Sequence, residues 1–348
     1  MELPWLLLLA AVPLFIVLLS GNKKNRANLP PGPVAVPVLG HLLWVRYKGM
    51  DVLRAIRRLH ARHGPVLALR VGSLLQVTVS DRRLAHAALV ERGAALADRP
   101  ASASRHMLGL DAATIARRGP RRDRKTKLGD DEGGRALTDD EMIAMCSEFL
   151  NGGTDTTSTA LQWIMAELVK NPAVQDKLHD EIKHTLASTG SVNPYVSEED
   201  VQRMPYLKAV ALEGLRRQAE DMELGGYTIP TGATVNFMVA DMGMDERAWE
   251  RPAEFAPERF MPGGDGEGTD ITGTREIMMM PFGAGRRICP GLNVATLHLE
   301  YFVANLVQAF QWHAPGGEEV DVASKKAEFT VVMANPLCAR LVPRGDVA

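Results

Sequence analysis

Apolar positions in the first third of the chain follow helix spacing and then strand spacing. Residues 51–63 carry apolar side chains on one side and basic side chains opposite, which predicts an amphipathic helix. Residues 66–70 and 76–80 predict two strands joined by a turn at Gly72, and therefore a β-hairpin. Residues 81–95 return to helical spacing. The pattern predicts a mainly α-helical fold with a small β region.

The second half of the chain is dominated by helical patterns. Residues 137–170 predict one long helix, and Thr138 precedes Glu141 by three positions, as in a capping box. Further helices are predicted to start at Asn171-Pro172, to follow a cap at Ser197–Asp200, and to run from Leu292 to Phe310.

The long helix is interrupted in its middle by Gly152-Gly153-Thr154-Asp155-Thr156-Thr157. Each glycine costs a helix about 1 kcal/mol relative to alanine, so the stretch needs a compensating role. The hydroxyl of Thr156 can bond back to the carbonyl of Gly152 and open a groove in the helix. A small diatomic ligand would fit that groove, with Asp155 beside it for proton delivery. The alternative is that the glycines allow a close helix–helix crossing.

The N-terminal residues predict a membrane anchor. Residues 3–19 contain no charge and Lys23, Lys24 and Arg26 follow them, so the positive-inside rule puts the rest of the chain on the cytosolic side. The alternative, a cleaved signal peptide, usually has a shorter apolar region and a basic leading end. We therefore expect a transmembrane anchor at residues 1–20, followed by a basic, proline-rich hinge at residues 21–40.

A charged segment divides the remainder of the chain. Most of residues 117–127 are basic, and acidic residues follow directly. Segments with opposite charge blocks and few apolar residues remain solvated, so we predict a linker at residues 116–136. The alternative is a docking surface for an acidic electron-donor protein. The predicted organisation is a helix and hairpin region at residues 41–115, the linker, and a helical body at residues 137–348.

Overall composition excludes some classes of function. The formal net charge is -2, which gives no indication of nucleic-acid binding. The three cysteines, at positions 146, 289 and 338, make no disulfide framework, and their wide spacing without a C-x-x-C pair also argues against a zinc site.

Candidate chemistry concentrates in residues 281–291, which read PFGAGRRICPG. Glycines let the backbone adopt positive φ and approach a flat ligand closely, and they leave N–H groups free to point at a sulfur. An arginine can pair with an anionic carboxylate of the ligand through two parallel hydrogen bonds. The dipole of the following helix favours a thiolate at its N-terminus. The alternative is a glycine-rich turn that contains a buried free cysteine.

Phe282, Gly285, Arg287, Cys289 and Gly291 have the spacing F-x-x-G-x-R-x-C-x-G. This spacing resembles the haem-binding motif of the cytochrome P-450 monooxygenases. The resemblance implies that Cys289 is the axial ligand of the iron of haem b and that Arg287 pairs with a haem propionate. Gly283, between Phe282 and Gly285, is expected to line the same site.

The same resemblance assigns roles to the interrupted helix. It identifies residues 152–157 as the oxygen-activating stretch, with Gly152 and Gly153 against the cofactor. Thr156 would steady an iron-bound peroxo group, and Asp155 would relay protons to it. With the cysteine loop present, we prefer this interpretation to the close crossing.

Three charged residues form a further candidate cluster. Glu213 and Arg216, three positions apart, would ordinarily be a surface ion pair worth a few tenths of a kcal/mol. They match the E-x-x-R pair of the resembling family, and Arg259 matches the arginine of its P-x-R-F segment. The resemblance implies that all three form one buried cluster that holds the cysteine loop in shape.

The chain departs from the family in two places. The linker stands where the family has a long helical stretch, and no tryptophan lies between Trp44 and Trp163 to contact a propionate. The stretch from Arg217 to Gly226 also lacks the family's proline-rich turn and pocket strand. We infer a cytochrome P-450-like fold that is internally shortened, lacks part of the distal helices and has impaired turnover.

The sequence predicts a haem-thiolate monooxygenase that inserts one oxygen atom of O2 into an organic substrate. Residues 148–157 resemble the plant microsomal members, which favours a small lipophilic substrate such as a fatty acid. The implied partner is a membrane flavoprotein reductase that supplies electrons from NADPH, and the implied location is the endoplasmic reticulum membrane. Two alternatives stay open: a non-catalytic or decayed haem-binding paralogue, and a membrane-tethered protein without haem.

Overall fold

The structure is a computed structural model of the 348-residue chain. It describes residues 29–33, 52–71, 74–97, 139–190, 195–218, 233–317, 319–327 and 331–345. The predicted anchor, most of the hinge, and the linker at 116–136 lie outside these ranges. Within them, no helix has the length and hydropathy that crossing a bilayer requires. The chain divides into two units, residues 1–91 with 221–238, and residues 92–220 with 239–348.

The first unit contains the predicted helix and hairpin. Helix α3 (Val52–His63) precedes strands β1 (Val66–Val71) and β2 (Leu74–Val79), which pair antiparallel with Val66 opposite Val79. Strand β2 begins two residues earlier than predicted. Strand β3 (Thr234–Phe237), which the sequence pattern did not indicate, pairs parallel to β2. Apolar side chains of α3 and β1 form a small core of Leu59, Leu67 and Leu69.

Two further segments of this unit add detail to the predictions. Part of the predicted hinge lies along β1: the N–H of Ala68 donates to the carbonyl of Pro31 at 2.8 Å. A Cβ at Gly32 would lie 2.1 Å from the carbonyl oxygen of Ala68, so only glycine fits there. The helix predicted at 81–95 is shorter. Helix α4 (Arg82–His86), capped by Asp81, continues as the π-helical turn η1 (Ala87–Glu91).

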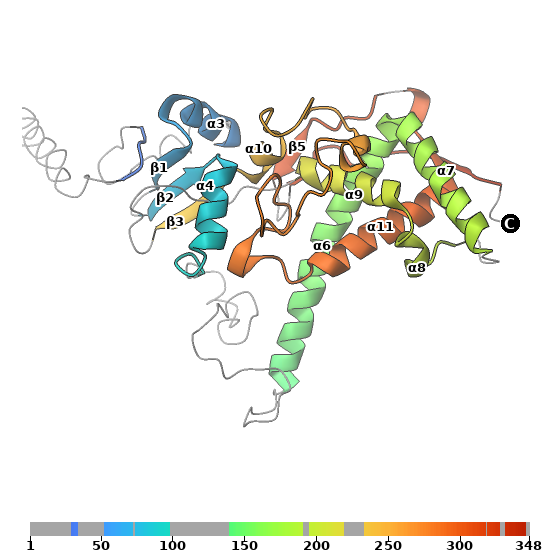
Figure 1. Ribbon diagram of the computed structural model, residues 1–348, viewed down its shortest axis with the longest axis horizontal. Coiled ribbons are helices and arrows are strands. Elements are labelled where there is room, and N and C mark those ends of the chain that lie inside the picture. Colours follow the sequence, from blue (N-terminus) through green and yellow to red (C-terminus); the bar gives the residue numbers. More distant parts are fainter. Residues whose placement is uncertain are drawn as a thin grey trace, which may run out of the picture. The chain divides into compact units, whose positions relative to one another are not determined.

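The second unit is mainly helical (Figure 1). The helix predicted at 137–170 is confirmed as α6 (Asp139–Lys170), while Thr138 lies outside the described residues. Ser197 and Asp200 form a capping box, but on a short helix of their own. The other helices are α7 (Pro172–Thr189), α8 (Glu198–Val201), α9 (Pro205–Gln218), α10 (Val239–Gly243) and α11 (Leu292–Ala309).

Helices α6, α7, α9 and α11 enclose the main hydrophobic core of this unit. The second half of α6 is buried from Trp163 to Val169, whereas its first half is largely exposed. At the contact of α6 with α9, a Cβ on Gly214 would lie 2.3 Å from Cγ1 of Ile164. Glycine therefore sets the distance between these two helices.

Short strands and 3-10 turns complete the second unit. The helix predicted to reach Phe310 ends at Ala309, because β4 (Phe310–His313) pairs with β7 (Arg340–Pro343). The remaining elements are β5 (Lys325–Ala327), β6 (Val331–Met333), η2 (Pro257–Phe260), η3 (Gly285–Arg287) and η4 (Pro315–Gly317). The predicted fold class, mainly helical with a small β region, is confirmed.

Candidate functional site

Cys289 lies on a closed loop immediately before α11. Its backbone N–H donates to the carbonyl of Phe282 at 2.8 Å, and the N–H of Ile288 donates to the carbonyl of Gly285 at 3.3 Å. The Cys289 side chain is exposed, which rules out the buried free cysteine considered from the sequence. The loop therefore presents a thiol outward on a backbone fixed by its own hydrogen bonds.

The glycines of this loop have two different roles. Gly283 and Gly285 adopt φ of 71° and 68°, a left-handed conformation that disfavours other residues. Gly291 has φ of -89° and occupies the N-cap position of α11, so the prediction of positive φ does not extend to it. A Cβ at Gly291 would lie 3.8 Å from Sγ of Cys289, which is ordinary contact.

Neighbouring side chains hold the loop against other parts of the second unit. The half-buried Arg287 donates from Nε to the carbonyl of Ala97 at 2.5 Å. Phe282 packs on the main hydrophobic core. Ala284 is buried next to Gly273, and a Cβ added to Gly273 would lie 3.0 Å from Cβ of Ala284. Pairing of Arg287 with a ligand carboxylate stays a prediction.

The glycine and threonine stretch of α6 shows the predicted hydrogen bond without the predicted interruption. Thr156 Oγ1 donates to the carbonyl of Gly152 at 2.7 Å, yet the helix is continuous through these residues. A threonine hydroxyl that bonds to the carbonyl four residues earlier can leave the helix continuous, as it does here. The predicted interruption of the helix is therefore wrong, whereas the groove for a small ligand beside Thr156 stays a prediction.

The close-crossing alternative also fails for the described residues. A Cβ at Gly152 or Gly153 would meet nothing within 4 Å, and residues 151–156, including Asp155 and Thr156, are exposed. The close crossing of α6 lies instead at Gly214. The glycines at 152 and 153 leave a strip of bare helix backbone beside a hydroxyl and a carboxylate.

Helix packing relates the two candidate regions. Cys289 immediately precedes α11, and α11 packs against the buried half of α6, as Figure 1 shows for the orange and green helices. The exposed stretch of α6 adjoins that buried half. An exposed thiol, an arginine beside it and bare helix backbone suit a planar, anionic, metal-containing ligand such as haem. The described residues contain no cluster of side chains typical of a directly bound metal ion.

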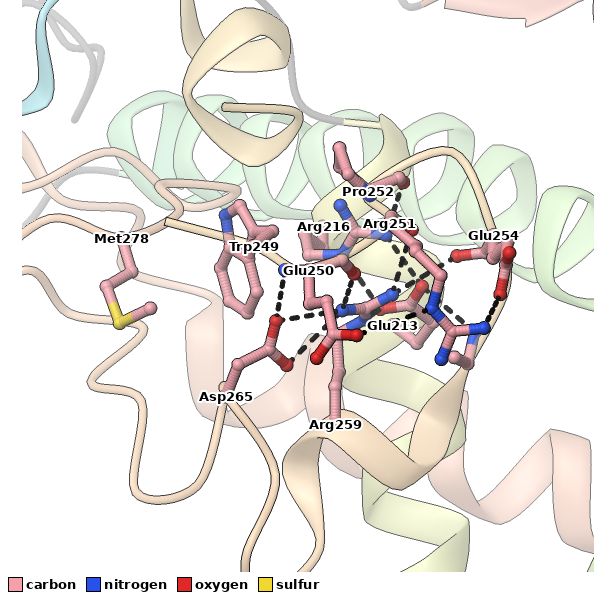
Figure 2. Close-up of polar contacts among 12 residues, drawn as sticks. Glu213, Arg216, Trp249, Glu250, Arg251, Pro252, Glu254, Arg259, Asp265 and Met278 are labelled. Carbon is pink, nitrogen blue, oxygen red and sulfur yellow. Dashed lines mark hydrogen bonds and ion pairs between the residues drawn. The ribbon is translucent and has the colours of Figure 1, made fainter. Parts of the chain in front are cut away.

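The prediction that Glu213, Arg216 and Arg259 form one buried cluster is confirmed (Figure 2), and its support of the cysteine loop stays a prediction. Glu213 and Arg216 are fully buried and form a bidentate pair, with nitrogen–oxygen distances of 2.7 and 2.8 Å. Arg259, 6% exposed, places Nε 3.0 Å from the same carboxylate. The surface ion pair suggested by local spacing alone is therefore incorrect.

The guanidinium groups of Arg216 and Arg259 also donate hydrogen bonds to backbone carbonyls. Arg216 donates to the carbonyls of Gly243 and Pro252, and Arg259 donates to the carbonyl of Glu250 at 2.9 Å. The ring of Trp249 lies 5.3 Å and 6.0 Å from the two guanidinium carbons. The cluster thereby fixes the irregular segment that follows α10. Sequence reasoning missed Trp249 and the nearby Asp265, because no local spacing connects either to Glu213.

A second polar group links α7, α9 and η2. Glu258 accepts from Lys177 Nζ at 2.6 Å and from the Tyr206 hydroxyl at 2.8 Å. Burial acts to raise the pKa of Glu258, but these two hydrogen bonds lower it below its ordinary value. Burial, together with the hydrogen bond to Glu258, raises the pKa of Tyr206. This arrangement is structural, because it joins elements on the outside of the core.

Glu181 on α7 caps the N-terminus of α9. Its two carboxylate oxygens accept from the N–H groups of Tyr206 and Leu207, both at 2.8 Å. Burial raises the pKa of Glu181, and the two backbone hydrogen bonds only partly oppose it. The carboxylate fixes the start of the helix that carries Glu213 and Arg216.

Comparisons with known proteins agree with this geometry. Cytochrome P450 89A9 of Arabidopsis thaliana is 49% identical over 226 residues, a match that covers 61% of this chain and 44% of that protein. Cytochrome P450 78A1 of Zea mays is 37% identical over 226 residues, covering 61% of this chain and 40% of that protein. The matches thus span less than half the length of these curated relatives.

A solved zebrafish cytochrome P450 with progesterone has the same fold, with a TM-score of 0.66 at 17% identity. It covers 85% of this chain and 99% of that structure. The family model described as cytochrome P450 matches residues 30–127 and 122–338, which include the cysteine loop, the α6 stretch and the buried cluster. The chain belongs to the cytochrome P450 family.

Proposed function

We propose that this chain binds haem b through Cys289 and acts as a haem-thiolate monooxygenase. The observation that carries the proposal is the exposed thiol of Cys289 on a loop closed by its own backbone hydrogen bonds. Bound haem would supply oxygen activation, because a thiolate ligand favours cleavage of the O–O bond. The protein's part is to provide the ligand, orient the cofactor and deliver protons.

Arg287 and the loop glycines would hold the cofactor in place. The left-handed Gly283 and Gly285 carry no side chain, so a flat ring can approach the backbone closely. Arg287 uses Nε for the carbonyl of Ala97, which anchors the guanidinium next to the loop. A guanidinium held there suits a propionate.

Thr156 and Asp155 would serve proton delivery. The Thr156 hydroxyl donates to the carbonyl of Gly152, so its orientation is fixed and its lone pairs remain available as acceptors. Asp155 is exposed at the adjacent position and can exchange protons with water. Gly152 and Gly153 leave room beside both groups for a small ligand.

The ligand assignment is tested by the spectrum of the reduced, carbon-monoxide-treated protein. The wild-type chain should show the Soret band of a thiolate-bound haem. Cys289→Ala should lose this band, whereas Cys146→Ala and Cys338→Ala, which change the other two exposed cysteines, should keep it. An unchanged band in Cys289→Ala would exclude Cys289 as the ligand. A wild-type chain with no haem band would favour the tethered protein without haem.

The substrate, the partner and the location complete the proposal. We expect a small lipophilic substrate such as a fatty acid, electrons from NADPH through a membrane flavoprotein reductase, and attachment to the endoplasmic reticulum membrane through residues 1–20. Incubation with reductase, NADPH and a panel of fatty acids should give hydroxylated products. Extraction of membranes with alkaline carbonate should leave the full chain in the pellet, and its release into the supernatant would contradict the anchor.

A decayed or poorly coupled haem protein is the second candidate function. The exposure of residues 151–156 favours it, because water at the reacting face allows reduced oxygen species to escape. The ratio of NADPH consumed to product formed separates the two candidates. Hydrogen peroxide in large excess over product supports the second candidate, and a ratio near one supports an efficient monooxygenase.

A further inference from the structure

The buried cluster carries an unbalanced charge if it is limited to its three central residues. Glu213 contributes one negative charge, while Arg216 and Arg259 contribute two positive charges, and all three are at most 6% exposed. A buried charge without a counter-ion is strongly unfavourable. The cluster therefore requires a second carboxylate.

Asp265 supplies this carboxylate. Its two oxygens lie 3.3 and 3.2 Å from Nη1 of Arg259, on the side away from Glu213 (Figure 2). The Asp265 side chain is only 25% exposed. With Asp265 included, two carboxylates face two guanidinium groups and the formal charge of the cluster is zero.

The same carboxylate joins two segments of backbone. Asp265 Oδ2 accepts from the N–H of Glu250 at 2.5 Å, while the carbonyl of Glu250 accepts from Arg259 Nη1 at 2.9 Å. The peptide groups on both sides of Glu250 are thus held by the Arg259–Asp265 pair. Loss of either charge removes the ion pair that ties these two contacts together.

The turn that carries Asp265 lies directly on the cluster. A Cβ at Gly264 would be 2.2 Å from the carbonyl oxygen of Arg259, and a Cβ at Gly266 would be 3.0 Å from the rings of Phe260 and Trp249. The N–H of Gly266 also donates to the carbonyl of Arg259 at 2.8 Å. The turn has no room to shift toward the cluster, so Asp265 has a defined position.

The segment after this turn supports the cysteine loop. Asp270 accepts from the N–H groups of Thr272, Thr274 and Arg275, which shapes residues 270–275. Gly273 and Ile277 then pack together beside Ala284, the buried residue between the two left-handed glycines of the cysteine loop. The chain that continues from Asp265 through residues 270–277 therefore leads to the backbone that presents Cys289.

We propose that Asp265 is a positioning residue for the cysteine loop, acting by balancing the charge of Arg259. The carboxylate keeps residues 261–280 in the conformation against which the loop packs. The inference rests on the proposed function in one respect, because the loop is taken there as the thiolate donor. Its primary test concerns the polypeptide and does not depend on haem.

The test compares Asp265→Asn, Asp265→Glu and the matched control Glu254→Gln in the full chain. Glu254 pairs with Arg251 at 2.6 Å in the same region, but both side chains are more than half exposed. Asp265→Asn should speed amide hydrogen exchange in residues 261–289 about tenfold or more, because the local structure opens more easily. Asp265→Glu should restore most of the protection, and Glu254→Gln should leave it unchanged.

A double-mutant cycle of Asp265 and Arg259 distinguishes charge balance from simple packing. If Arg259→Gln removes the positive charge, adding Asp265→Asn should change exchange by less than about threefold, because nothing remains to balance. If Asp265→Asn alone does not fold, the comparison of Arg259→Gln with the double variant still tests whether Asp265 acts through the charge of Arg259. An equally large effect of Asp265→Asn in both backgrounds, or exchange like that of Glu254→Gln, would overturn the proposal.

The carbon-monoxide spectrum of the same samples separates this inference from the proposed function. Asp265→Asn should lower the share of haem that shows the thiolate band, relative to wild type. A wild-type chain without that band rejects the proposed function, while the exchange results still decide the role of Asp265.

Discussion

Replacing Glu213 by Gln provides a stringent test of the buried cluster. The substitution keeps the shape of the side chain but removes the negative charge that faces Arg216 and Arg259. The Glu213 carboxylate also accepts from the N–H of Ala256 at 3.2 Å. The new amide group would point N–H donors at guanidinium donors, so some of these contacts cannot be replaced.

The expected cost follows from the burial of the cluster. Removing one member of a buried ion pair typically costs about 3–5 kcal/mol, because its partner stays buried without a counter-charge. Glu213 and Arg216 are fully buried, so the upper part of that range applies, and Asp265 balances only one of the two arginines. The total stability of a domain is about 5–15 kcal/mol, so this loss is a large share of it and should be readily measured.

Urea unfolding followed by circular dichroism measures this cost. Glu213→Gln should lower the free energy of unfolding by about 4–5 kcal/mol. The control Glu254→Gln, which removes an exposed pair, should lower it by less than about 1 kcal/mol. A loss below about 1 kcal/mol for Glu213→Gln would mean that the cluster is hydrated or that its charges are balanced otherwise, and would refute the argument.

Three further substitutions test other parts of the fold. Gly214→Ala should lower stability by about 1–3 kcal/mol, because its Cβ would lie 2.3 Å from Cγ1 of Ile164; an unchanged melting temperature would contradict this contact. Gly152→Ala should instead raise stability by about 0.5–1 kcal/mol, since its Cβ meets nothing within 4 Å; a destabilised variant would reveal a hidden packing constraint. Glu181→Gln should weaken the cap of α9 and remove a pH dependence. Because burial raises the pKa of Glu181, its contribution to stability is fully present below its ordinary value of 4.5 and declines as the pH rises through the higher folded value. The difference in the free energy of unfolding between wild type and Glu181→Gln should therefore shrink with rising pH, which urea unfolding at several pH values would measure. A difference that grows with pH would mean that the pKa of Glu181 is lowered in the folded state.

Helices could be predicted from the sequence because their signals are local. The start of α7 at Pro172 and the course of α11 from Leu292 agree with their predictions. Strand β3 and the pairs β4–β7 and β5–β6 were not predicted. They are three or four residues long and depend on partners elsewhere in the chain, so no periodic pattern marks them. The pairing of β4 with β7 also ends α11 at Ala309, one residue before the apolar pattern ends.

The candidate site shows the same division between local and distant information. The hydrogen bond from Thr156 to Gly152 could be predicted because it joins residues four apart in one helix. The burial of Glu213 and Arg216 could not be inferred from their spacing, which also suits a surface pair; the family resemblance supplied it. Asp265 belongs to a turn whose only distinguishing sequence feature is its glycines. Its contact with Arg259 depends on how that turn folds back, which no local pattern encodes.

The parallel pairing of β3 with β2 has a consequence for the order in which the chain folds during synthesis. Strand β2 ends at Val79, but its partner ends only at Phe237, so the ribosome must add all intervening residues before this sheet can be completed. At about 5–20 residues per second, that interval lasts on the order of 10 s. Throughout it, one edge of the β1–β2 hairpin stays open to other chains. We therefore expect nascent chains stalled before Thr234 to depend on chaperones more than chains stalled after Phe237.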